Sequence, residues 1–139
     1  MILYCDTSSL VKLYIEEYHS ADVHILVREA DIVATCCVAL PEMVSALTRR
    51  FNNRQLNQQG YQALLQSVRN DWRHIVSLDF DELLAANLAE RHGLRGFDAV
   101  HLASALKLAA REQVSVQFSA FDEQLVRVAS AEGLTVVAV

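Results

Sequence analysis

Cysteine is scarce in this chain, with three residues, Cys5, Cys36 and Cys37, among 139. An odd number of cysteines, two of them adjacent, provides neither a disulfide framework nor a CxxC metal pair. A fold held together by disulfide bonds is therefore excluded. We interpret all three cysteines as small buried apolar residues in a reducing cytoplasm.

Long hydrophobic runs are also missing, although hydrophobic residues make up 53% of the chain and the mean hydropathy is +0.18. Stretches such as Cys36–Leu40 are far shorter than the roughly 20 apolar residues that a membrane-spanning helix needs. No basic segment precedes Asp6, so we expect no secretory signal. This composition indicates a compact globular protein of the cytoplasm that has no membrane partner.

Positive charge is scarce overall, and the formal net charge of −5 argues mildly against a passive nucleic-acid binder. The charge is unevenly spread, since residues 49–73 contain five arginines and one aspartate, a local net charge of +4. The remainder of the chain therefore carries −9. Such asymmetry indicates either a lobe that faces phosphates or an acidic partner, or a solvated helical surface.

Strand-like and helix-like segments alternate along the chain, and no linker, repeat or low-complexity segment interrupts them. The periodicity predicts strands at Ile2–Cys5, Ile32–Thr35, Ile75–Leu78, Val114–Phe118 and Thr135–Val139. It predicts helices from Asp6 to Tyr14 and at Ser20–Ala30, Cys37–Phe51, Leu56–Trp72, Asp81–His92, Phe97–Arg111 and Asp122–Glu132. Strands separated by helices connect through right-handed crossovers, which predicts one α/β domain with a mainly parallel sheet between helices.

Four carboxylates stand where apolar runs give way to helix-like patterns: Asp6, Glu42, Asp98 and Asp122. Acids at strand exits and helix entrances of an open α/β sheet point into one crevice, where ligands of such folds bind. Their mutual repulsion is relieved when divalent cations neutralise them, so the pattern predicts a metal site. The alternatives are helix N-caps for the aspartates, and for Asp98 an ion pair with Arg95 one turn earlier.

The segments around these acids resemble the PIN-domain ribonucleases, and most closely the VapC-type toxins of toxin–antitoxin pairs. The segments are DTSSLVKLYIEE from Asp6, PEMVSALTRR around Glu42, LRGFDAVHLASAL around Asp98 and FSAFDEQL around Asp122. The resemblance covers nearly the entire chain in order. It implies a single PIN-like domain over residues 1–139, a three-layer sandwich whose central, mainly parallel sheet has four to five strands flanked by helices. It also implies cleavage of RNA that depends on Mg²⁺ or Mn²⁺.

By this resemblance Asp6, Glu42 and Asp98 match the three acids that hold metal at the active centre of the family. Hydrolysis of a phosphodiester needs a strong nucleophile and relief of charge in the transition state, and hard cations held by carboxylates supply both. We therefore expect a metal-activated water to attack phosphorus. The 3′-hydroxyl leaves, and the product carries a 5′-phosphate, as in the family.

Asp122 matches the fourth acid of the family, which lies at the edge of the site and often acts through water. The family commonly has Thr or Ser two residues before this aspartate. Here Ala120 stands at that position and Ser119 comes one step earlier. This departure leaves open whether a hydroxyl of this loop contributes.

His101 follows Asp98 by three residues on the expected helix, a spacing that puts both on one face. A transition-metal site is one interpretation of such a pair. The apolar setting AVHLASAL favours a packed, hydrogen-bonded histidine of the core or of an interface instead. The other histidines show no ligand spacing: His19, His24, His74 and His92.

Six polar residues near the acids are candidates for substrate binding: Thr7, Ser8, Lys12, Arg49, Arg95 and Ser119. Thr7 and Ser8 either bind phosphate or a metal-bound water, or cap the helix that follows. Lys12 and Arg95 lie close in sequence to the ligand candidates and are candidates for contact with the RNA backbone. Arg49 either binds phosphate or receives an acidic side chain of an inhibitor.

The resemblance implies two protein partners, a cognate antitoxin whose C-terminal segment blocks the acid site and a second copy in a homodimer. Apolar positions in Leu10–Ile15 and Phe51–Tyr61 suit either an interface or the core.

Two other functions remain open, a catalytically silent binding module and another metal-dependent phosphoesterase, such as a DNA nuclease or a phosphatase. A haloacid-dehalogenase-like phosphatase needs a second aspartate where Ser8 stands. The acid and lysine set of a response-regulator receiver is also missing from the sequence.

Overall fold

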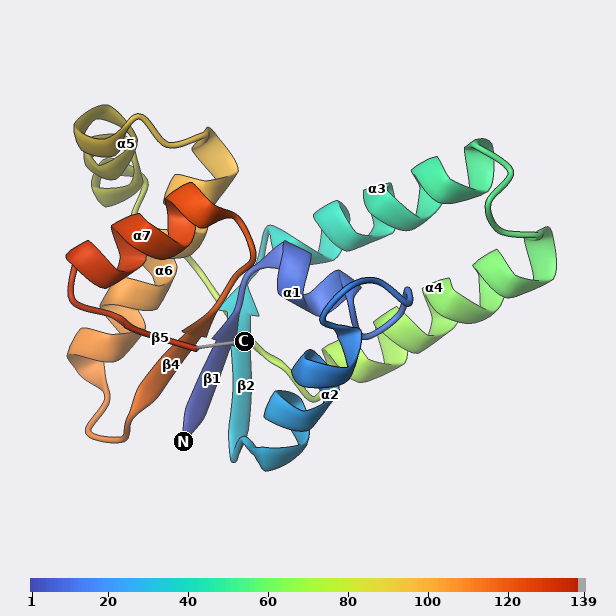
Figure 1. Cartoon of the computed structure of the whole chain (residues 1–139), viewed down its shortest axis with the longest axis horizontal. Helices are drawn as coiled ribbons and strands as arrows, with labels where there is room; N and C mark the ends of the chain where they lie inside the picture. The colour runs from blue at the N-terminus through green and yellow to red at the C-terminus, as the bar shows by residue number, and fades with distance from the viewer. Residues whose placement is uncertain (138–139) are drawn as a thin grey trace.

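Five parallel strands form the centre of the computed structural model, which describes residues 1–137 (Figure 1). The strands are β1 (Ile2–Cys5), β2 (Ile32–Cys36), β3 (Val76–Leu78), β4 (Val116–Ser119) and β5 (Thr135–Val136). Their order is β3-β2-β1-β4-β5, and every neighbouring pair runs parallel. The strand order therefore reverses between β1 and β4. In open α/β sheets the ligand crevice forms at the carboxyl ends of strands at such a reversal.

Helices cover both faces of the sheet. Within residues 1–137 they are α1 (Thr7–Val11), α2 (Ser20–Glu29), α3 (Ala39–Asn52), α4 (Gln58–Trp72), α5 (Glu82–His92), α6 (Gly96–Arg111) and α7 (Glu123–Ala131). In Figure 1 the helices α5, α6 and α7 lie on one side of the strands, and α1 to α4 lie on the other. The three-layer α/β arrangement expected from the sequence is confirmed.

Alternate residues of β1 feed two separate hydrophobic cores, as the two-residue period of a strand requires. Ile2 and Tyr4 pack with the α5–α7 layer, whereas Leu3 and Cys5 pack with α1, α3 and α4. All four side chains are buried. Because β1 is covered on both faces, the residue that follows it, Asp6, emerges between the two helical layers.

Aspartate and asparagine side chains begin several of these helices. The Asp6 carboxylate accepts from the backbone N–H of Ser9, and that of Asp122 accepts from Leu125. Asn57 caps α4 in the same way, so that this helix begins at Gln58 rather than at Leu56 as expected. The capping alternative considered for the acids thus holds for Asp6 and Asp122.

Some expected boundaries differ from the structure. The helix after Asp6 ends at Val11 instead of continuing to Tyr14, because the chain turns away from Lys12 onward. Strand β4 begins at Val116, since Val114 lies exposed in the preceding turn. The expected last strand is present at Thr135–Val136, and residues 138–139 of that expectation lie outside the described part.

The expectation that all three cysteines are buried is wrong for one of them. Cys5 and Cys36 are buried, whereas Cys37 is exposed. Cys37 comes directly after the last residue of β2, where the chain leaves the sheet and turns into α3. None of the helices found in residues 1–137 is long and apolar enough to cross a membrane.

Candidate metal and phosphate site

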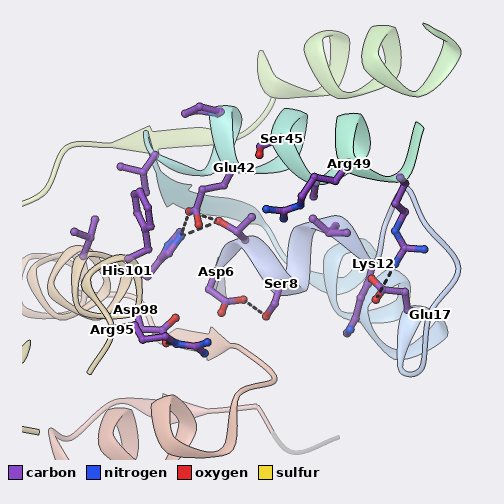
Figure 2. A pocket seen from close by; sticks show the side chains of 18 of the residues that line it. Asp6, Ser8, Lys12, Glu17, Glu42, Ser45, Arg49, Arg95, Asp98 and His101 are labelled. Atoms are coloured by element: carbon purple, nitrogen blue, oxygen red, sulfur yellow. Dashed lines mark hydrogen bonds and ion pairs between the residues drawn. The ribbon is translucent and has the colours of Figure 1, made fainter. Parts of the chain in front are cut away.

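A pocket of about 1400 Å³ opens where β1 and β2 end and where α1, α3 and α6 begin (Figure 2). Asp6, Glu42 and Asp98 all line it. Asp6 precedes α1, Glu42 lies in the first turn of α3, and Asp98 lies in the first turn of α6. Three acids that are far apart in the sequence therefore share one pocket.

Asp6 is the most deeply buried of these acids, with 4% of its surface exposed. Its Oδ1 accepts hydrogen bonds from the Ser8 hydroxyl at 2.8 Å and the Ser9 backbone N–H at 2.9 Å. Burial raises the pKa of Asp6, and the charge of Asp98 adds to this rise, whereas His101 and the two hydrogen bonds counteract it. A carboxylate disfavoured as an anion by burial and by a second acid is stabilised when a cation joins them.

Glu42 is held by a hydrogen-bonded chain that reaches into the core. Its Oε1 accepts from the Thr7 hydroxyl at 2.6 Å and lies 3.2 Å from Nε2 of His101. On the other side of the ring, Nδ1 of His101 lies 2.9 Å from the Tyr4 hydroxyl. Burial alone would raise the pKa of Glu42, but the hydrogen bonds from His101 and Thr7 outweigh it, so the pKa is lowered.

The sequence-based expectation of a packed, hydrogen-bonded His101 is confirmed, since the residue is 2% exposed. Its contact with Glu42, however, was not foreseen. The spacing in the sequence pairs His101 with Asp98. In the structure the His101 ring instead points toward Glu42 of α3 and away from Asp98 (Figure 2).

Arg95 joins Asp98 to the fourth acid, Asp122. Its Nε lies 3.3 Å from Asp98 Oδ2, and its Nη2 lies 3.0 Å from Asp122 Oδ2. The expected alternative of an Arg95–Asp98 pair is thus present. The Arg95 side chain is 76% exposed, and exposed ion pairs contribute only about 0–1 kcal/mol. Asp122 does not line the pocket itself and is linked to it through Arg95, which does.

Five of the six candidates for substrate binding line the pocket: Thr7, Ser8, Lys12, Arg49 and Arg95. Figure 2 shows Arg49 projecting from α3 toward Glu42.

Ser119 is placed differently from these candidates. It is buried, and its hydroxyl lies 2.8 Å from that of Ser9, so its hydrogen-bonding capacity serves the contact between β4 and α1. A structural role therefore accounts for Ser119.

The donor set fits a hydrated divalent cation. In the described part of the chain no three His, Cys, Asp or Glu side chains come close enough to enclose an ion by themselves. Mg²⁺ usually binds through one or two carboxylates and keeps several of its waters, which matches acids spread along the wall of an open pocket. Hard oxygen donors also exclude a preference for soft metals.

Comparison with known proteins gives consistent results. The family description that matches residues 3–131 is PIN domain. Ribonuclease VapC45 of Mycobacterium tuberculosis (strain CDC 1551 / Oshkosh) is 34% identical over 112 residues, which are 76% of this chain and 75% of that protein.

Two solved structures share the fold. PAE2754 from Pyrobaculum aerophilum superposes with a TM-score of 0.70 at 16% identity, covering 98% of this chain and 89% of that one. VapBC2 from Rickettsia felis, bound to a DNA fragment from its promoter, superposes with a TM-score of 0.63 at 14% identity, covering 99% and 98%.

Proposed function

This chain belongs to the PIN domain family, and we propose that it is a divalent-metal-dependent endoribonuclease, the toxin of a type II toxin–antitoxin pair. The observation that carries this proposal is the convergence of Asp6, Glu42 and Asp98 on one pocket at the carboxyl ends of β1 and β2. The relative with 34% identity is named as a ribonuclease, which supports RNA as the substrate. The proposal treats residues 1–139 as a single domain.

In this proposal Asp6, Glu42 and Asp98 hold Mg²⁺ or Mn²⁺. When bound, such a cation supplies an activated water and relief of charge for phosphodiester hydrolysis, with 5′-phosphate and 3′-hydroxyl products. Thr7 fixes the Glu42 carboxylate through its 2.6 Å hydrogen bond. Ser8 does the same for Asp6 at 2.8 Å.

Positive side chains around the same pocket supply contacts to the RNA backbone. Arg49 and Lys12 line the pocket on the side of α3 and α1. Arg95 lies next to Asp98 and Asp122, and its exposed guanidinium is free to move to a phosphate, because its two ion pairs are weak. Contacts of this kind position RNA without reading its sequence. Asp122 assists from the edge.

A cognate antitoxin and a second copy of the chain complete the proposal. The antitoxin would block the pocket, where three acids offer partners for a basic side chain and Arg49 offers one for an acidic side chain. The shared fold with the VapBC2 complex supports the antitoxin as a partner.

The test is cleavage of single-stranded RNA by purified protein with Mg²⁺ or Mn²⁺, with and without a chelator. Wild-type protein should cut RNA only with metal, and Asp6→Asn should lose at least about 100-fold in rate. Single-stranded and duplex DNA of the same sequence serve as alternative substrates. Cleavage that survives exhaustive chelation, or that Asp6→Asn retains, would refute the proposal. Preferential cleavage of DNA would show that DNA, rather than RNA, is the substrate.

A further inference from the structure

The contacts of His101 form one continuous path from the centre of the sheet to the pocket. Tyr4, in the central strand β1, is fully buried. Its ring stacks on that of Phe118, with 5.6 Å between the ring centroids. Its hydroxyl meets Nδ1 of His101 at 2.9 Å. The opposite nitrogen, Nε2, lies 3.0 Å from the Thr7 hydroxyl and 3.2 Å from Glu42 Oε1. Figure 2 shows the ring of His101 directed at Glu42.

The hydrogens of this path can be assigned from its chemistry. The Thr7 hydroxyl has a single hydrogen, and it points to Glu42 Oε1 at 2.6 Å. A carboxylate only accepts, so both oxygens near Nε2 present lone pairs to it. Nε2 must therefore carry a hydrogen, because two oxygen lone pairs facing a bare nitrogen would repel it. In the neutral ring Nδ1 is then the acceptor, and the Tyr4 hydroxyl donates to it.

Packing holds the Tyr4 hydroxyl in place for its hydrogen bond with His101. The packing of the Tyr4 ring against Phe118 and edge-on against His101, at 5.9 Å, fixes the direction of that hydroxyl. The donor sequence runs from Tyr4 through His101 to Glu42 in one direction.

Glu42 needs such support, because a glutamate side chain loses much rotamer freedom when it is fixed. The hydrogen bonds of its side chain found in residues 1–137 all end on Oε1. Among the described residues no hydrogen bond to Oε2 is found, and Glu42 lines the pocket.

We propose that His101 and Tyr4 are positioning residues that hold Glu42 in its pocket-facing conformation and thereby set the affinity of the site for a divalent cation. The inference rests on the proposed metal-dependent function. It assigns a task to two buried residues besides the four acids, His101 of α6, which lines the pocket, and Tyr4 of β1, which does not. Groups that orient a metal ligand typically change metal affinity about 10- to 100-fold when removed.

The experiment measures the dissociation constant for Mn²⁺ by electron paramagnetic resonance on the full chain, without RNA. Three variants separate positioning from packing. His101→Leu removes both nitrogens, His101→Gln keeps an N–H donor near the position of Nε2, and Tyr4→Phe removes only the hydroxyl. Leu108→Val, about two turns further along α6, is the matched control for a small loss of core packing. Urea unfolding confirms that each variant is folded.

We expect His101→Leu to bind Mn²⁺ about 10- to 100-fold more weakly than the wild type, and Tyr4→Phe several-fold more weakly. His101→Gln should restore the affinity to within about threefold, and Leu108→Val should match the wild type. If His101 only filled space in the core, His101→Gln would not restore the affinity for Mn²⁺, because that rescue requires an N–H that donates to Glu42.

A folded His101→Leu with wild-type affinity would overturn the inference while leaving the proposed function intact. Should His101→Leu fail to fold, Tyr4→Phe decides, and unchanged Mn²⁺ affinity in that variant is the overturning result. Wild-type protein that binds no Mn²⁺ at all would remove the proposed function itself, and it is measured before any variant.

Discussion

Replacing Arg95 with alanine tests how much its positive charge offsets the negative charges of Asp98 and Asp122 before a cation binds. The guanidinium lies 3.3 Å from Asp98 and 3.0 Å from Asp122, and the Arg95 side chain is 76% exposed. Exposed ion pairs contribute about 0–1 kcal/mol, so Arg95→Ala should lower the free energy of unfolding by about 1 kcal/mol or less. The fold therefore survives the substitution.

The same substitution removes a positive charge beside two acids of the proposed site. Two unit charges about 4 Å apart interact by about 1 kcal/mol in water and by about 4 kcal/mol at an effective dielectric constant of 20. Because Arg95 is exposed, the lower figure applies, which corresponds to about fivefold tighter binding of Mn²⁺. Binding of RNA should weaken, since the proposed contact of Arg95 with a phosphate is lost.

Calorimetric titration with Mn²⁺ at low ionic strength measures this effect, together with urea unfolding of the same samples. Arg91→Ala is the matched control, because Arg91 is also exposed and pairs with Glu132 at 2.8 Å, away from the pocket. It should leave the affinity for Mn²⁺ unchanged. Folded Arg95→Ala with unchanged or weaker Mn²⁺ binding would refute the reasoning.

Two further predictions concern other parts of the molecule. In the folded protein a thiol reagent should modify Cys37 rapidly and Cys5 only after denaturation, because burial raises the pKa of Cys5 to about 12; equal rates in a native-state thiol assay would contradict this. The hydrogen bond from His92 lowers the pKa of Glu132, so this contact stabilises the fold at neutral pH and is lost as the pH falls through that lowered pKa. Glu132→Gln should accordingly lower Tm at pH 7, and its difference from wild-type Tm should shrink as the pH falls below the ordinary range of a glutamate, whereas a Tm difference independent of pH in thermal melts would count against it.

Much of the fold could be predicted from the sequence, because it depends on local rules. Apolar runs and helical periodicity locate the strands and helices to within a few residues. Parallel topology then brings the ends of β1 and β2 to the same edge of the sheet, and with them Asp6 and Glu42. The exposure of Cys37 could not be predicted in this way, because a shift of one residue decides whether a side chain still belongs to a strand or already lies in the turn after it.

The connections among the site residues could not be predicted in the same way. Tyr4 and His101 are 97 positions apart, and Arg95 and Asp122 are 27 apart. Whether these groups meet depends on how far α6 is shifted and rotated on the sheet, which is set by side-chain packing across the core. An apolar context reveals that His101 is buried, but it carries no information on which carboxylate its ring will reach.

Diffraction from crystals grown with Mn²⁺, measured at a wavelength where manganese scatters anomalously, tests the central claim most directly. The account predicts an anomalous peak in the pocket between Asp6, Glu42 and Asp98, about 2.1 Å from an oxygen of at least one of them. A peak elsewhere on the protein, or none at saturating Mn²⁺, would contradict the assignment of these three acids as one metal-binding site.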